Sequence, residues 1–154
     1  MDSPIWKPNE SQIRNANITK LLSHANQKAG LDFSNYWDLH QYSIDHSDKF
    51  WRLVADYCGA IGDFSGPVRV GESMIDTKWF PEASLNFSET MLARRDKADA
   101  IVFRGENKVE LRLSFNDLYE QVAKVQAHMK ACGVGPGDRV AAFLPNHPAA
   151  IIGM

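Results

Sequence analysis

Hydrophobic residues recur at helical spacing through the first part of the chain, up to about Arg95. We predict a first helix that is capped by Ser11, continues toward Ala29 and stops at Gly30. Its apolar face consists of Ile18, Leu21, Leu22 and Ala25. A second helix is predicted over residues 36–44.

A third helix is predicted to begin after Ser47 and to end at Gly59. Its apolar face would consist of Phe50, Trp51, Val54, Tyr57 and Cys58. Residues 62–78 contain Gly66-Pro67 and show only weak strand alternation, so this segment is predicted to be mostly loop.

A short fourth helix is predicted from a cap at Asn86 to about Arg95. From Ala98 onward the pattern changes to strands and helices in turn. Residues 100–104 form an apolar run, and residues 109–113 alternate between apolar and charged. We therefore predict a hairpin with a turn over residues 105–108, whose second strand has one buried face.

Ser114 and Asp117 have the Ser-x-x-Asp spacing of a capping box. The helix that they begin is predicted to end at Gly133, and its apolar stripe is Leu118, Val122, Val125 and Met129. A strand is predicted over residues 139–144. Pro148 suits the first turn of a last helix, in which Met154 is the final residue.

The order hairpin, helix, strand, helix predicts an α/β fold with a helical amino-terminal extension. The strand over residues 139–144 needs a parallel neighbour, and none follows it in this sequence. We therefore interpret the chain as a truncated domain, with an extension over residues 1–95 and the start of an α/β domain over residues 96–154.

Composition excludes several classes of function. The net charge is -2, with 44% hydrophobic and 23% charged residues, so neither nucleic acid nor an anionic membrane is an expected partner. The short basic cluster 94–97 is interpreted as a solvated helix end. We find no membrane span and no signal peptide, and Cys58 and Cys132 are isolated, so we expect a cytosolic protein.

Two segments resemble ligand-binding loops. Residues 133–137 are rich in glycine, but they follow a helix and precede a strand, the reverse of a nucleotide-binding loop. We interpret them as a helix stop and a tight turn. Residues 144–148 follow a predicted strand, where ligands bind in α/β sheets, yet Asn146 is better explained as a helix cap and His147 as an exposed loop residue.

The remaining polar residues show no catalytic or metal-binding spacing. His24, His40, His46 and His128 are scattered, and Asp45, Asp48 and Asp56 are interpreted as solvated. Five aromatic residues are interpreted as core and as the seam between domains rather than as a ligand pocket: Trp37, Phe50, Trp51, Trp79 and Phe80. No residue is therefore assigned as catalytic, cofactor-binding or metal-binding.

Several blocks together resemble the acetoacetyl-CoA synthetases of the acyl-adenylate-forming superfamily. Residues 5–8 resemble the opening of that family, and residues 45–51 its first helical segment with a Phe-Trp pair. Residues 79–92 resemble its pattern Trp-Phe-Pro-Gly-x-x-Leu-Asn-Tyr-Ala-Glu-Asn-Leu-Leu, from which this chain departs at Glu82, Phe87, Ser88 and Thr90. Residues 113–118 and 133–140 resemble the generic start of the superfamily, and the similarity covers nearly the whole chain.

The resemblance implies an ATP-dependent acetoacetate–CoA ligase, which forms an acyl-adenylate and pyrophosphate and then acetoacetyl-CoA and AMP. It also implies ATP, Mg²⁺ and CoA as cofactors of the full enzyme. The family's phosphate loop, ribose-binding Asp and catalytic Lys match no position here. This chain is therefore expected to be inactive alone, with no bound cofactor and with the rest of the ligase chain as its partner.

Two alternatives stay open: a short, non-catalytic interaction module, and the same part of an acetyl- or propionyl-CoA synthetase. If the chain is part of a ligase, Trp79, Phe80, Leu85 and Leu92 are expected to clamp the extension to the following domain.

Overall fold

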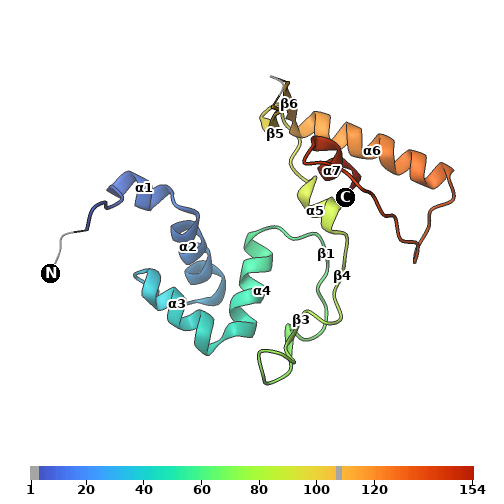
Figure 1. Ribbon diagram of the computed structural model, residues 1–154. Helices are drawn as coiled ribbons and strands as arrows, with labels where there is room; N and C mark the ends of the chain where they lie inside the picture. Colours follow the sequence, from blue (N-terminus) through green and yellow to red (C-terminus); the bar gives the residue numbers. More distant parts are fainter. Residues whose placement is uncertain (1–3, 107–108) are drawn as a thin grey trace. The chain divides into compact units, whose positions relative to one another are not determined.

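The computed structural model describes residues 4–106 and 109–154. The chain divides into two compact units, residues 1–85 and residues 86–154, which are described in turn (Figure 1). Unit 1 contains α1 (Glu10–Asn15), α2 (Asn17–Ala29), α3 (Tyr36–Asp45), α4 (Ser47–Tyr57), β1 (Gly62–Asp63), β2 (Arg69–Val70), β3 (Lys78–Trp79) and β4 (Ser84–Leu85). Unit 2 contains α5 (Phe87–Met91), β5 (Asp99–Arg104), β6 (Glu110–Ser114), α6 (Phe115–Ala131) and α7 (Pro148–Gly153).

The core of unit 1 lies among α2, α3 and α4 (Figure 1). Its buried side chains are Leu21, Ala25, Leu39 and Leu53, and partly buried residues such as Phe33 and Phe50 pack around them. Each helix contributes one or two of these residues from a single face, which is the arrangement that amphipathic spacing predicts.

The first predicted helix is two helices in the structure. Asn9, not Ser11, caps α1, and it forms a capping box with Gln12. The helix then breaks at Ala16, whose ψ of 140° is extended, and α2 begins at the next residue. The Ile13 carbonyl accepts from the Ala16 N–H at 3.2 Å and from the Thr19 hydroxyl at 2.7 Å, so the end of α1 is hydrogen-bonded across the break. The predicted stop at Gly30 is confirmed, since its φ is 63°.

The apolar face of α4 was predicted partly wrongly. Leu53 is its most buried residue, and Phe50, Val54 and Tyr57 lie beside it at the i, i+3, i+4, i+7 spacing of one helical face. Trp51 and Cys58 fall outside this spacing and are exposed. The predicted end at Gly59 is confirmed by its φ of 64°, and α3 occupies the predicted position with one added residue.

Residues 62–78 are mostly loop, as predicted, but short antiparallel pairs, which were not predicted, occur over residues 62–85. β1 pairs with β4 and β2 pairs with β3, each over two residues. Phe80 has a φ of 45°, which is unusual for a residue with a large side chain. Its N–H donates to the Val68 carbonyl at 2.7 Å, and its ring lies against Phe64 at 5.4 Å and beneath the Arg52 guanidinium at 5.3 Å. These contacts hold the residue in its strained conformation.

Unit 2 contains the predicted hairpin of β5 and β6, followed by α6 (Figure 1). The Ser114–Asp117 capping box and the stop at Gly133, with a φ of 84°, are confirmed. The predicted stripe on α6 is partly buried. The predicted cap at Asn86 is also confirmed, but α5 ends at Met91 rather than near Arg95.

The predicted buried face of the second hairpin strand is mostly wrong. Val109 is 56% exposed and Leu111 is 37% exposed, and of the three apolar residues only Leu113 is partly buried. A hairpin of two strands has little surface to cover both of its faces. The predicted turn over residues 105–108 lies in part outside the described residues.

The strand predicted over residues 139–144 does not form. This segment joins no sheet of the described chain, and Phe143 and Val140 are strongly exposed. A strand exists only with a neighbour that pairs with its backbone, and β5 and β6 pair with each other alone in this part of the structure. Pro148 begins α7 at its first position, as predicted.

The α/β class with a helical amino-terminal region is confirmed. Among the described residues, no helix has both the length and the apolar character needed to cross a membrane.

Candidate functional site

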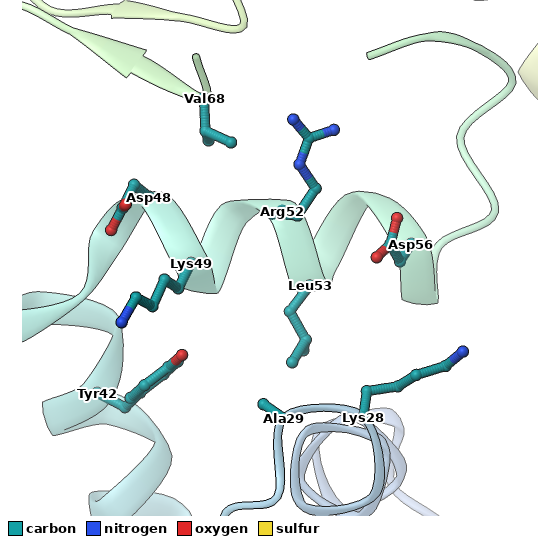
Figure 2. Close-up of a pocket in the computed structure, with 9 residues that line it drawn as sticks. All are labelled: Lys28, Ala29, Tyr42, Asp48, Lys49, Arg52, Leu53, Asp56 and Val68. Atoms are coloured by element: carbon teal, nitrogen blue, oxygen red, sulfur yellow. The ribbon is translucent and has the colours of Figure 1, made fainter. Parts of the chain in front are cut away.

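A hollow of about 360 Å³ in unit 1 lies between α2, α3 and α4 (Figure 2). Leu53 projects from α4 toward Ala29 at the end of α2, and these two side chains form an apolar floor. Tyr42 of α3 closes one side. Burial and, secondarily, the nearby Asp48 carboxylate raise the pKa of the Tyr42 hydroxyl, so the phenol stays neutral at physiological pH.

The charged side chains around this hollow do not converge on one point. Lys49 extends from the same side of α4 as Leu53, and Lys28 lies opposite them at the end of α2. Arg52 projects from the other side of α4 (Figure 2). Arg52 is already engaged, since it donates to the Gly66 carbonyl at 3.4 Å and stacks on Phe80. The hollow can therefore accept a small amphipathic group, but it is not preorganised for a phosphate.

The acidic residues that line the hollow are solvated, as predicted. Asp48 and Asp56 are exposed. Asp45 does not line the hollow, and its carboxylate accepts a hydrogen bond from the Gln41 side chain at 3.0 Å. The hollow itself was not predicted, because it depends on Lys28 from one helix and Tyr42 from another. Only the spacing of Lys49, Leu53 and Asp56 along α4 was visible in the sequence.

The histidines lie apart from one another. His24 packs its ring against Tyr57 at 5.4 Å, and its Nε2 is buried without a hydrogen-bond partner. His46 lies between α3 and α4, so it is not in the same continuous helix as His40. In the described ranges, no group of three His, Cys, Asp or Glu side chains is placed to hold a metal ion.

The glycine-rich segment 133–137 is a helix stop and a tight turn, as predicted. Gly133 and Gly137 have φ values of 84° and 92°. The Gly135 N–H donates to the Asp138 carboxylate at 2.8 Å, and the Asp138 N–H donates to the Gly135 carbonyl at 3.1 Å. These bonds close the turn on itself.

The loop over residues 144–148 is the second candidate site. His147 is exposed, as predicted, but the cap of α7 is His147 and not Asn146. Its Nδ1 accepts from the Ala149 N–H at 3.1 Å, and its ring lies 5.1 Å from the Phe103 ring of β5. These residues border a hollow of about 290 Å³. The cap falls on His147 because Pro148 supplies the first helical residue.

The aromatic residues predicted as core are largely exposed within unit 1. Trp37 is 71% exposed, Trp51 44% and Trp79 43%, although Trp51 and Trp79 meet edge to face at 5.8 Å. Phe50 and Phe80 are partly buried. The core prediction is therefore wrong for the three tryptophans, and the seam between domains stays a prediction.

Unit 2 has an apolar hollow of about 330 Å³. It is lined by side chains of α5, β5, α6 and α7, among them Phe87, Ile101, Leu118 and Ile151. No charged side chain lines it, so it offers apolar contact and no acid–base chemistry.

Two family models match the chain. The model described as acetyl-coenzyme A synthetase N-terminus matches residues 36–91, and the model described as AMP-binding enzyme matches residues 88–154. Together they run from α3 to the last residue. The chain is therefore similar, in two consecutive segments, to the amino-terminal region of acetyl-coenzyme A synthetases and to AMP-binding enzymes.

The chain is homologous to acetoacetyl-CoA synthetases. It is 35% identical to the acetoacetyl-coenzyme A synthetase of Rhizobium meliloti (strain 1021), over 97% of this chain and 23% of the relative. It is 31% identical to malonamoyl-CoA synthetase of Penicillium aethiopicum, over 97% of this chain and 22% of the relative.

A solved structure, that of acetoacetyl-CoA synthetase from Streptomyces lividans, matches with a TM-score of 0.82 and 32% identity. The match covers 98% of this chain and 24% of that protein. The chain thus spans about a quarter of the length of the relatives that it matches, and it corresponds to their amino-terminal part.

Proposed function

We propose that the chain acts as the amino-terminal part of an ATP-dependent acetoacetate–CoA ligase. The complete enzyme would convert acetoacetate, ATP and CoA into acetoacetyl-CoA, AMP and pyrophosphate. The observation that carries this proposal is the structural match over 98% of the chain to a protein named acetoacetyl-CoA synthetase. This activity would place the enzyme in ketone-body and lipid metabolism, and we propose the cytosol as its compartment.

The residues of this chain do not fit ATP, Mg²⁺ or CoA by themselves. The sequence has no Gly-x-x-x-x-Gly-Lys-Ser/Thr loop, and the described part of the structure offers no metal-binding group of three. The cations near the hollow of unit 1 do not converge. We therefore assign all three cofactors to the rest of the ligase and propose that the chain is inactive alone.

The proposed role of the chain is structural. Residues 1–95 would form the extension typical of acetyl-CoA-synthetase-type enzymes, and residues 96–154 would begin the adenylation domain. The remainder of the ligase chain would be the partner, with Trp79, Phe80, Leu85 and Leu92 as contacts. The exposure of Trp79 and Leu85, at 43% and 53%, supports this because large apolar side chains are more stable when covered.

A second candidate is a non-catalytic interaction module. The observation that favours it is the apolar hollow of unit 2, beside a hairpin of only two strands whose outer edges are unpaired in the described sheet. A third reading keeps the ligase but changes the acyl group to acetyl or propionyl. The similarity to a malonamoyl-CoA synthetase supports keeping the substrate open, because this region is shared between relatives of different named specificity.

A chimera tests the structural role. Residues 1–154 would replace the matched 24% of the Streptomyces lividans protein, and pyrophosphate release would be measured with acetoacetate, ATP and CoA. We expect activity from the chimera and none from the 154-residue chain. A matched chimera carrying Leu39→Ala controls for folding of the grafted part. A folded chimera that is inactive would contradict the proposal.

The mass of the native product separates the first two candidates. An antibody to residues 1–95, combined with intact-protein mass spectrometry, would detect the product in its source cells. We expect a product several times larger than 17.3 kDa. A stable product of 17.3 kDa would instead favour the interaction module.

A further inference from the structure

The turn between β2 and β3 displays two large apolar side chains to solvent. Met74 is 93% exposed and Ile75 is 91% exposed. Exposure alone does not distinguish this turn, because Ile5 and Phe143 are at least as exposed. Those two residues, however, lie in segments of the described chain that form no hydrogen-bonded turn. The segment at Met74 and Ile75 combines exposure with a fixed backbone.

Hydrogen bonds close the turn on both sides of this pair. The Thr77 N–H donates to the Ser73 carbonyl at 3.0 Å, and the Thr77 hydroxyl donates to the same carbonyl at 2.7 Å. The Ser73 hydroxyl accepts from the Asp76 N–H at 3.2 Å and donates to the Asp76 carboxylate at 2.6 Å. Gly71 has a φ of 104°, and a Cβ there would lie 2.5 Å from the Asp76 carbonyl oxygen. The chain therefore approaches itself closely at the base of the turn, as glycine permits.

The turn is also anchored to the rest of unit 1. β2 and β3 pair with each other at its base. The Arg69 guanidinium donates to the Ser47 hydroxyl of α4 at 3.1 Å and to the Glu72 carbonyl at 3.5 Å. The exposed pair is thus held on a rigid support, so little backbone freedom remains to be lost when these side chains dock against another surface.

We propose that Met74 and Ile75 form a knob that inserts into an apolar socket of the ligase chain outside residues 1–154. This inference rests on the proposed function, in which the chain is only part of the enzyme, as it covers 24% of the matched solved structure. Burial of two large apolar side chains is favourable. Glu72 and Asp76 flank the knob in the sequence, so a socket whose rim carries cations or hydrogen-bond donors fits it best.

The small size of the knob selects a partner within the same chain. A stable complex between separate proteins buries about 800 Å² on each partner, far more than two side chains provide. A covalent connection raises the effective concentration of the two surfaces, so a contact of this size suffices inside one chain. Neither a second copy nor a separate protein is held by the knob alone.

Methionine oxidation in the native product tests the knob without any substitution. Hydrogen peroxide converts Met74 to its sulfoxide at a rate that follows its exposure. Peptide mass spectrometry gives the rate constant in the folded protein and in the same protein unfolded by denaturant. We expect folding to slow the oxidation of Met74 by roughly tenfold or more, the factor that burial of one such side chain supplies. Without a socket, its 93% exposure leaves almost no slowing.

Two variants of the same product test the role of the closed turn. Ser73→Ala removes the hydroxyl that bonds to Asp76, and it should speed the oxidation of Met74 in the folded protein by roughly two- to tenfold, the worth of one hydrogen bond. Ser73→Thr keeps a hydroxyl and is the matched control, with the natural rate. Met129 of α6 is the internal control and should oxidise equally in all three proteins. An unchanged Met74 rate in Ser73→Ala would overturn the rigid presentation of the knob.

The mass of the product keeps this proposal distinct from the proposed function. In a product several times larger than 17.3 kDa, slowing that is independent of protein concentration would support the socket. Equal rates in the folded and unfolded states of that product would overturn the knob and leave the ligase proposal intact. Slowing that increases with protein concentration would assign the knob to a second copy and overturn the socket. A native product of 17.3 kDa would overturn both proposals.

Discussion

The two units of this chain differ in how they bury apolar side chains. Unit 1 has a small core, in which Leu39 is 2% exposed and Ala25 is fully buried. Unit 2 has no buried aliphatic or aromatic side chain among its described residues, and Pro148 is its buried residue. A helical cluster can enclose a core with three short helices, whereas a hairpin needs further strands or helices to cover its faces.

This difference indicates which apolar side chains need further contacts to become buried. The apolar positions of unit 2 surround an open hollow, and Phe143 is fully exposed in a segment with a strand-like sequence. Unit 1 encloses its aliphatic residues but leaves Trp37, Trp51 and Trp79 exposed. We therefore expect unit 1 to hold its fold in isolation better than unit 2, and both to gain stability from added contacts.

The largest effect is expected for Trp79→Ala in the proposed ligase. If other parts of that protein cover the ring, its loss should lower the free energy of unfolding by about 3–5 kcal/mol. In the 154-residue chain, where the ring is 43% exposed and contacts Trp51, we expect only about 1 kcal/mol. Calorimetric melting of both proteins measures the difference. An unchanged melting midpoint in the ligase would contradict the clamp.

A substitution in the core of unit 1 should test directly whether the two units differ in how they bury apolar side chains. Leu39→Ala should lower the free energy of unfolding of unit 1 by about 2–5 kcal/mol, because it leaves a cavity in a small core. All four tryptophans lie in residues 1–85, so their fluorescence reports the unfolding of unit 1 alone.

The matched control is Leu118→Ala in unit 2, where the side chain is only partly buried. We expect this substitution to lower the free energy of unfolding of α6 by about 1 kcal/mol. The measurement is unfolding in denaturant, with circular dichroism as the signal. Equal losses at both positions would remove the distinction between an enclosed core and an open one.

Local signals in the sequence predicted much of this fold. The stops at Gly30, Gly59 and Gly133 and the caps at Asn86 and Ser114 were visible because each depends on residues within one turn. The break at Ala16 was missed because no breaker residue marks it. The Asn9–Gln12 capping box was present in the sequence and would have corrected the start of α1.

Features that depend on distant residues were predicted less well. The pattern of residues 139–144 indicates a strand, but a strand needs a partner that local spacing cannot supply. The hollow of unit 1 unites residues from three helices. His147 was recognised as exposed, yet its capping role depends on ring geometry and on Pro148, so it was assigned to Asn146. The absence of catalytic residues stays a prediction.

A smaller effect is expected for the cap of α6. Ser114→Ala removes the acceptor of the Asp117 N–H, at 3.1 Å, and should lower the free energy of unfolding of unit 2 by about 1 kcal/mol. Ser114→Thr keeps a hydroxyl that can accept from the Asp117 N–H and donate to its carboxylate, and it serves as the control, with stability close to that of the natural chain. Because unit 2 lacks an enclosed core, this loss should be visible in its helix content while the tryptophan fluorescence of unit 1 stays unchanged.

The smallest effect is an acid sensitivity that the two units share. Hydrogen bonds from Ser114 hold the pKa of Asp117 below its ordinary 3.8, and hydrogen bonds from Ser34 and then Asn35 do the same for Asp38 at the start of α3. A lowered pKa in the folded state means that each ionised carboxylate stabilises its helix above the ordinary value. That contribution is lost as the pH falls below 3.8 toward the lowered pKa.

Asp117→Asn and Asp38→Asn should each remove one of these acid transitions, as followed by helix content between pH 5 and pH 2. Asp117 is exposed and Asp38 is partly exposed, so both transitions should weaken in high salt. A transition at Asp38 with none at Asp117 would mean that the start of α6 is not formed in the isolated chain. The contrast between the units would then extend from their cores to their helix caps.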